Sequence, residues 1–173
     1  MKVIKKILSI LAVVCAVVIL CRAMCFVYPK KYESDVKKYA RMYDIDEELI
    51  FSVIKAESDF DKSAVSKKGA IGLMQVMEDT GVWVSERIGI SGFSVSDLYN
   101  PDQNIEIGAY YLSYLLDLYD DDVKCALAAY NAGPANVNEW LDNTTTLKNI
   151  PFPETEKYVK KAQRYIKIYE LLY

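Results

Sequence analysis

The amino-acid sequence predicts an all-α protein built as a bundle of short helices. The first observation is that apolar residues recur at three- and four-residue spacing in one segment after another from position 32 onward. The second is that these segments begin with Asp, Thr or Pro and are separated by stretches rich in Gly, Asn or Asp. The third is that no run alternates between apolar and polar residues for long enough to indicate a strand.

The first 28 residues differ from the remainder. Lysines lie near the start, and the 15 positions of Ile7–Cys21 carry no charged residue. Arg22 interrupts the run, which then stays apolar to Val27. If the Arg22 side chain reaches the interface, the run attains the roughly 20 residues that a membrane-spanning helix needs. We therefore expect residues 1–28 to form a signal-anchor or transmembrane segment and residues 29–173 to form the folded domain.

The orientation of this segment follows from its charges. Basic residues at the start place the N-terminus in the cytoplasm and the domain outside, as in a single-pass protein of the cell membrane. Secretion after signal cleavage is the alternative, although the stretch 21–23 offers a poor small-residue cleavage site. A buried core helix is the third reading. Since Cys125 is the lone cysteine beyond this segment, the domain is expected to have no internal disulfide.

The helices expected in the domain, in chain order, are 32–43, 46–58, 80–88, 101–119, 123–130, 134–141 and 153–172. The first has apolar positions at 32, 36, 39, 40 and 43. Asp46 can cap the second, and Thr80 the third. Between these two helices we expect a polar loop, a glycine-punctuated turn at 69–72 and a short apolar element at 73–77.

The second half of the domain has similar start and stop signals. After an expected loop at 90–100, Pro101 opens the longest helix of the domain. Asp121 or Asp122 can cap the next helix, and Gly133 ends it. The last two helices begin with proline, and the stretch 143–152 between them is expected to be a loop.

Composition excludes several classes of chemistry. The chain has no histidine, which removes Ser-His-Asp and Cys-His catalysis and His-ligated zinc. Beyond residue 28 there are 17 basic residues against 24 acidic ones, and no basic patch interleaved with aromatic residues, so nucleic-acid binding is disfavoured. The sequence implies no metal and no cofactor. Chemistry near neutral pH must then come mainly from carboxylates, Lys, Tyr or Cys.

Glu57 is the most informative residue. It continues the stripe of Ile50, Val53 and Ile54 at helical spacing, so a carboxyl group occupies the next core-facing position. Burial disfavours the charged form and raises the pKa of such a carboxyl, as a general acid acting near neutral pH requires. Periodicity alone leaves open a structural glutamate that is hydrogen-bonded to neighbouring backbone.

Three separated motifs carry a resemblance to a known family. Residues 57–77 read ESDFDKSAVSKKGAIGLMQVM, residues 129–133 read AYNAG, and PET at 153–155 is followed by YV at 158–159. In this order they resemble the lytic transglycosylase family of the soluble-transglycosylase type, which is related to goose-type lysozyme. The similarity extends from about residue 45 to about residue 160. It departs from the family's pattern at three loop positions, Lys62, Lys67 and Glu78, where proline is frequent.

The resemblance implies a lysozyme-like fold around a sugar-binding cleft. It implies cleavage of the β-1,4 bond between N-acetylmuramic acid and N-acetylglucosamine in peptidoglycan, with formation of a 1,6-anhydro ring and no reducing end. Residues 29–173 would be the catalytic domain, and Glu57 would be the catalytic acid. The expected substrate-binding residues are Ser66, Gln75, Met77, Tyr130, Asn131, Glu154 and Tyr158.

Other functions remain open from the sequence. A plain muramidase would need a second carboxylate to activate water, and Asp59 and Asp61 are the nearby candidates, although we expect both to be solvated or to stabilise the loop. A non-catalytic peptidoglycan-binding scaffold is a second alternative. The expected partners are peptidoglycan glycan strands, the membrane and, as a further hypothesis, a protein of an envelope complex.

Overall fold

The computed structural model describes residues 2–141 and 146–173 and confirms the all-α class. The regular structure of these residues is helical, apart from isolated bridges that pair Ile71 with Val65 and with Val76. The helices are α1 (Lys2–Val27), α2 (Glu33–Met42), α3 (Glu47–Glu57), α4 (Glu78–Ile88), the 3-10 helix η1 (Val95–Tyr99), α5 (Pro101–Leu118), α6 (Val123–Ala132), α7 (Pro134–Leu141) and α8 (Pro153–Leu172).

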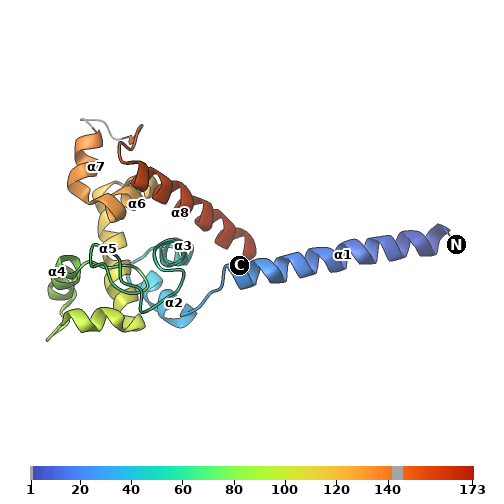
Figure 1. Ribbon diagram of the computed structural model, residues 1–173, viewed down its shortest axis with the longest axis horizontal. Coiled ribbons are helices and arrows are strands. Elements are labelled where there is room, and N and C mark those ends of the chain that lie inside the picture. Colours follow the sequence, from blue (N-terminus) through green and yellow to red (C-terminus); the bar gives the residue numbers. More distant parts are fainter. Residues whose placement is uncertain (1, 142–145) are drawn as a thin grey trace.

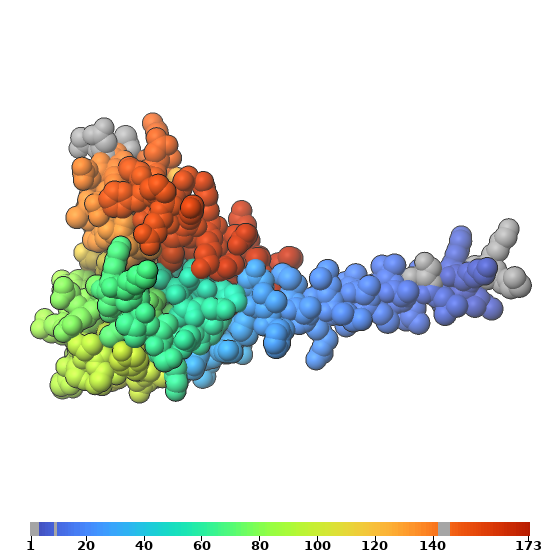
Figure 2. All heavy atoms as spheres, viewed as in Figure 1, coloured from blue at the N-terminus to red at the C-terminus, as the bar shows by residue number. Residues whose placement is uncertain are grey.

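The helices from α2 to α8 gather into one body, and α1 projects from it as a long separate rod (Figure 1). The space-filling view in Figure 2 shows the same division, with almost all of α1 standing clear of the body. Within α1, Ile4–Val27 has a mean hydropathy of 2.8 and none of its most apolar stretch is buried. Its length and composition suit a membrane-spanning helix, and they also suit a signal sequence.

The core lies where α3, α5, α6 and α8 meet. α3 packs most extensively against α8, which also contacts α6, while α5 is covered by α2 and α6. Ile50, Val53 and Ile54 of α3 are fully buried, so the stripe that the sequence indicates does face the core. Full burial of each such side chain contributes about 1.5–3 kcal/mol, which holds α3 and therefore its last residue, Glu57, in a fixed place.

Several sequence-based expectations need correction. Thr80 does not cap α4, because the helix already begins at Glu78, where Glu78 and Asp79 place negative charge in the first turn. The expected loop 90–100 contains η1, which begins with a capping box between Ser94 and Asp97.

The expected caps of α3 and α6 are confirmed only in part. Asp46 stands at the N-cap position of α3, but its side chain makes no capping hydrogen bond. Asp122, and not Asp121, caps α6 by accepting from the Cys125 amide. The expected loop 143–152 falls partly outside the described residues, at positions 143–145.

The junction between α1 and the body is held by the end of α8. The Tyr173 hydroxyl donates to the Tyr28 carbonyl at 2.9 Å, and the Tyr169 hydroxyl donates to the Pro29 carbonyl at 3.2 Å. The Tyr28 ring also packs edge-on against Tyr169. The first two residues of the connection between α1 and α2 are therefore fastened to the end of α8.

Candidate active site

Glu57 is the last residue of α3, the helix that packs most extensively against α8. The side chain is partly buried, and burial raises the pKa of its carboxyl group to about 7 against an ordinary value of 4.5. Hydrogen bonding from Tyr158 and the positive charge of Lys161 both lower this pKa and so oppose the effect of burial. A carboxyl group that is half protonated near neutral pH can donate a proton and later accept one.

Tyr130 and Tyr158 meet Glu57 from two different helices. Burial raises the pKa of both hydroxyls, and the negative charge of Glu57 raises it further. Tyr130, on α6, donates to the Met74 carbonyl at 2.8 Å and so connects the Glu57 region to the loop before α4. Of the site residues expected from the sequence, the structure thus brings Glu57, Tyr130 and Tyr158 together.

The Tyr158 hydroxyl is the buried polar atom of the described residues that lacks a hydrogen bond of good geometry. It nevertheless lies close enough to Glu57 to lower the pKa of that carboxyl through hydrogen bonding. A buried hydroxyl without a firm partner costs about 1–3 kcal/mol, and a small rotation toward Glu57 or a hydrogen bond to a ligand removes that cost. Glu57 is the neighbouring group with which Tyr158 can complete a hydrogen bond.

Ser66 and Gln75 lie on the loop that Tyr130 reaches. The Ser66 hydroxyl accepts from the Ala70 amide at 3.0 Å, which closes a turn. Gln75 has a left-handed backbone, and its Nε2 atom donates to the carbonyls of Ala64 and Gly72 at 3.1 and 2.9 Å. Both side chains shape the loop, and neither makes a described contact with Glu57.

The remaining expected binding residues lie on the surface. Met77 is 42% exposed at the start of α4, and Glu154 is exposed in the first turn of α8. Asn131 is exposed and accepts a hydrogen bond from the Thr155 hydroxyl at 2.8 Å, which links α6 to α8. Their expected roles in substrate binding stay predictions.

Sequence reasoning missed Asn104, which organises the loop. Asn104 is fully buried in α5, where its Oδ1 atom accepts from the Met74 amide at 2.8 Å. Its Nδ2 atom donates to the carbonyls of Ile71 and Leu98 at 2.9 and 2.8 Å. The sequence gives no signal for this role, because Asn104 stands among the polar residues Asp102, Gln103 and Glu106.

The two carboxylates that a hydrolytic mechanism would recruit are engaged elsewhere. Asp59 is exposed and forms an ion pair with Lys55. Asp61 is exposed and accepts from the backbone amide and the hydroxyl of Ser63, which closes the turn after it. Both carboxylates are therefore exposed to solvent and bonded to nearby residues, in agreement with the expectation that they are solvated or stabilise the loop.

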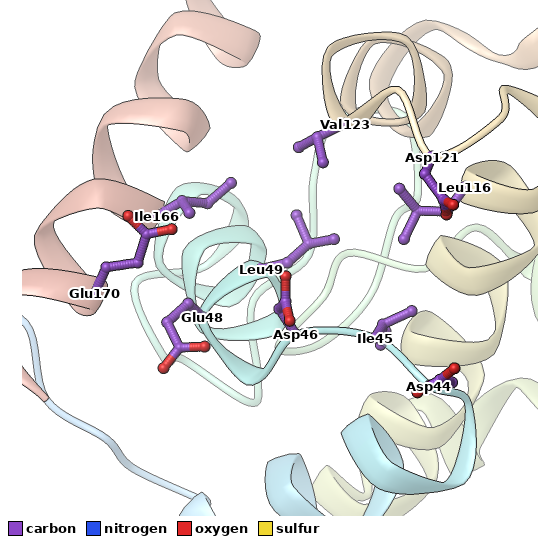
Figure 3. A pocket seen from close by; sticks show the side chains of 10 residues that line it. All are labelled: Asp44, Ile45, Asp46, Glu48, Leu49, Leu116, Asp121, Val123, Ile166 and Glu170. Carbon is purple, nitrogen blue, oxygen red and sulfur yellow. The ribbon is translucent and has the colours of Figure 1, made fainter.

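One hollow on the surface lies next to the Glu57 cluster, and another pocket lies farther away. One, of about 320 Å³, is lined by Asp79, Thr80, Trp83, Arg87, Tyr111, Tyr114 and Pro134. The Tyr111 ring lies 5.5 Å from the Tyr130 ring between centroids, so this aromatic hollow adjoins the Glu57 cluster. The pocket in Figure 3 lies at the other end of α3, around Glu48 and Leu49, about 13 Å along the helix axis from Glu57.

The geometry can be compared with known proteins. The family model described as the transglycosylase SLT domain matches residues 34–152, which is most of the chain. The chain belongs to the transglycosylase SLT family. Relatives include the soluble lytic murein transglycosylase of Escherichia coli K12, 33% identical over 80% of this chain, and the membrane-bound lytic murein transglycosylase C of Shigella sonnei, 38% identical over 65% of it.

Solved structures of the SLT family share the fold. The lytic transglycosylase Slt of Pseudomonas aeruginosa superposes with a TM-score of 0.79 at 33% identity, covering 86% of this chain. The 70 kDa soluble lytic transglycosylase of Escherichia coli does so with a TM-score of 0.80 at 31% identity. The expected lysozyme-like fold is confirmed. The chain spans 23% of the Escherichia coli soluble relative, 34% of the Shigella protein and 25% of each of these two solved chains.

Proposed function

We propose that the chain is a peptidoglycan lytic transglycosylase. It would cleave the β-1,4 bond between N-acetylmuramic acid and N-acetylglucosamine and leave a 1,6-anhydro-N-acetylmuramic acid end. The observation that carries the proposal is Glu57, whose pKa is raised to about 7 by burial at the end of α3. Membership of the SLT family, with relatives named lytic murein transglycosylases, supports the same reaction.

The mechanism uses one carboxyl group twice. Protonated Glu57 donates its proton to the bridging oxygen as the glycosidic bond breaks. The carboxylate then removes the proton from the C6 hydroxyl of the muramic acid residue, and that oxygen bonds to C1 and closes the anhydro ring. Intramolecular attack has a high effective molarity and needs no activated water. The engagement of Asp59 and Asp61 in the loop supports this single-carboxylate route over a two-carboxylate muramidase.

Substrate binding would use the surface around this acid. The aromatic hollow beside Tyr111 and Trp83 offers ring faces on which sugars can stack. The buried Tyr158 hydroxyl would donate to the Glu57 carboxyl and so help to hold the acid beside the glycan. Ser66, Gln75 and the residues expected from the family motifs would line the rest of the glycan path.

The long apolar helix α1 supports a location at the membrane. We propose that this helix is an uncleaved single-pass anchor with the domain on the outer side of the cytoplasmic membrane, where peptidoglycan lies. Extraction of cell membranes with alkaline carbonate would leave an anchored protein in the pellet and release a processed, secreted one. A crosslinking pull-down with α1 intact would test for an envelope-complex partner.

The reaction is tested by mass spectrometry of peptidoglycan digested with the full chain in detergent, beside Glu57→Gln. Anhydro-muropeptides from the wild type and none from the variant are the expected result. Reducing-end products would instead identify a muramidase. Binding to peptidoglycan without products from either protein would favour the scaffold function.

A further inference from the structure

Lys161, on α8, makes a contact with the end of α3 that no sequence motif indicates. Its Nζ atom donates to the Ala56 carbonyl at 2.8 Å, and Ala56 directly precedes Glu57. The last carbonyl groups of a helix have no partner within the helix, and a cation there also interacts favourably with the helix dipole. Lys161 therefore fastens the end of α3 to α8 at the residue before the acid.

We propose that Lys161 is a positioning residue for Glu57, which ties the last turn of α3 to α8 and holds a positive charge beside the acid. The inference deepens the proposed transglycosylase reaction and rests on it for its functional meaning. The contact itself is a property of the folded chain, so it can be tested separately from catalysis.

The charges around Glu57 come from two helices. Within the described part of the chain, the ionisable groups that interact with its carboxyl are Tyr130 of α6 and Tyr158 and Lys161 of α8. On α3 itself, Lys55 is paired with Asp59. Lys161 is thus the one cation in this set, and it lowers the pKa of Glu57 while burial raises it.

A carboxyl group that serves first as acid and then as base needs a pKa near the working pH, so that it is neither always protonated nor always ionised. Burial without a compensating cation would leave Glu57 a weak acid that stays protonated at alkaline pH. A strong nearby charge would leave it ionised and unable to protonate the leaving oxygen. The Lys161 ammonium is bonded to the Ala56 carbonyl, so its charge acts on the Glu57 carboxyl without forming an ion pair with it in the described structure.

The experiment compares three variants of the full chain in detergent micelles. Lys161→Met removes both the charge and the hydrogen bond, whereas Lys161→Arg keeps both functions. Lys160→Met is the matched control, because Lys160 is exposed and its Nζ atom pairs with Glu156. The Glu57 carboxyl is titrated by carbon NMR after labelling of glutamate, with its signal assigned by its loss in Glu57→Gln.

The expected result is an upward shift of the Glu57 titration midpoint in Lys161→Met, and no shift in Lys161→Arg or Lys160→Met. The ratio of muropeptide release at alkaline to acidic pH rises in Lys161→Met alone, because Glu57 stays protonated to higher pH. This ratio is insensitive to a uniform loss of activity or of folded protein.

An unchanged midpoint in Lys161→Met, measured on folded protein, would overturn the proposal and reduce Lys161 to a clamp between helices. A shift equally large in Lys161→Arg would overturn it as well. If the wild type released no muropeptides, the proposed function would fail, while the titration would still decide the role of Lys161.

Discussion

Replacement of Glu57 by Gln should stabilise the protein at alkaline pH and leave its stability at acidic pH nearly unchanged. Gln has the same shape as Glu and cannot ionise. In the folded chain the pKa of Glu57 is about 7, and in the unfolded chain it returns to its ordinary value of 4.5. The two states therefore hold different numbers of protons between these values.

The sign of the effect follows from this difference. Between pH 4.5 and about 7 the folded state keeps a proton on Glu57 that the unfolded state has lost, so the free energy of unfolding falls as pH rises. Each pKa unit corresponds to about 1.4 kcal/mol, so the difference amounts to about 3 kcal/mol above pH 7. Below pH 4.5 both states are protonated and the penalty vanishes.

The assay is urea unfolding of the full chain in micelles, followed by tryptophan fluorescence, at about pH 4 and about pH 8.5. The gain of Glu57→Gln over the wild type should appear only at the higher pH, at about 3 kcal/mol. Glu86→Gln, an exposed control on α4, should show the same pH dependence as the wild type. An equal gain at both pH values would refute the raised pKa, and with it the basis for Glu57 as a general acid.

Three further predictions concern the loop beside the acid. Tyr130→Phe removes the hydroxyl bonded to the Met74 carbonyl, so unfolding free energy should fall by about 1–3 kcal/mol, as measured in urea, and activity should fall without vanishing. Gly72→Ala should destabilise far more than Gly69→Ala in thermal unfolding, because both have positive φ but only the Cβ at Gly72 would clash with backbone and side-chain atoms. Asn104→Leu removes the side-chain partner of the Met74 amide and the Leu98 carbonyl, while the Ile71 carbonyl keeps its bond from the Val76 amide, so the change should cost at least about 2 kcal/mol in urea unfolding.

The sequence predicted the helical architecture because helix signals are local. The stripe through Ile50 and Ile54 and the prolines that open helices are written in consecutive residues, and the structure confirms those helices. The same stripe located Glu57, since a carboxyl in an apolar row is visible without a fold. The Thr80 cap was wrong because Glu78 and Asp79 can also begin a helix, and propensity alone cannot choose between the two starts.

Contacts between distant segments could not be predicted in this way. Asn104 bonds to residues about 30 positions away, and Lys161 reaches a carbonyl more than 100 positions earlier. Nothing in the spacing of either residue indicates those partners, because the pairing depends on how α5 and α8 lie against the loop and α3. The motif residues Ser66 and Gln75 were recognisable from the family, but their bonds within the loop became visible only in three dimensions.

The fastening of residues 28 and 29 to the end of α8 limits how far the domain can travel. In the proposed topology a flexible tether would let the enzyme sample a range of heights above the bilayer. Here five residues separate α1 from α2, and the first two of them are bonded to the end of α8, so the connection would act as a short and constrained tether. A domain of this size has a radius of gyration of roughly 15 Å, so an anchored domain on so short a tether would stay close to the bilayer. In the proposed topology, this domain would meet the glycan strands nearest the membrane first.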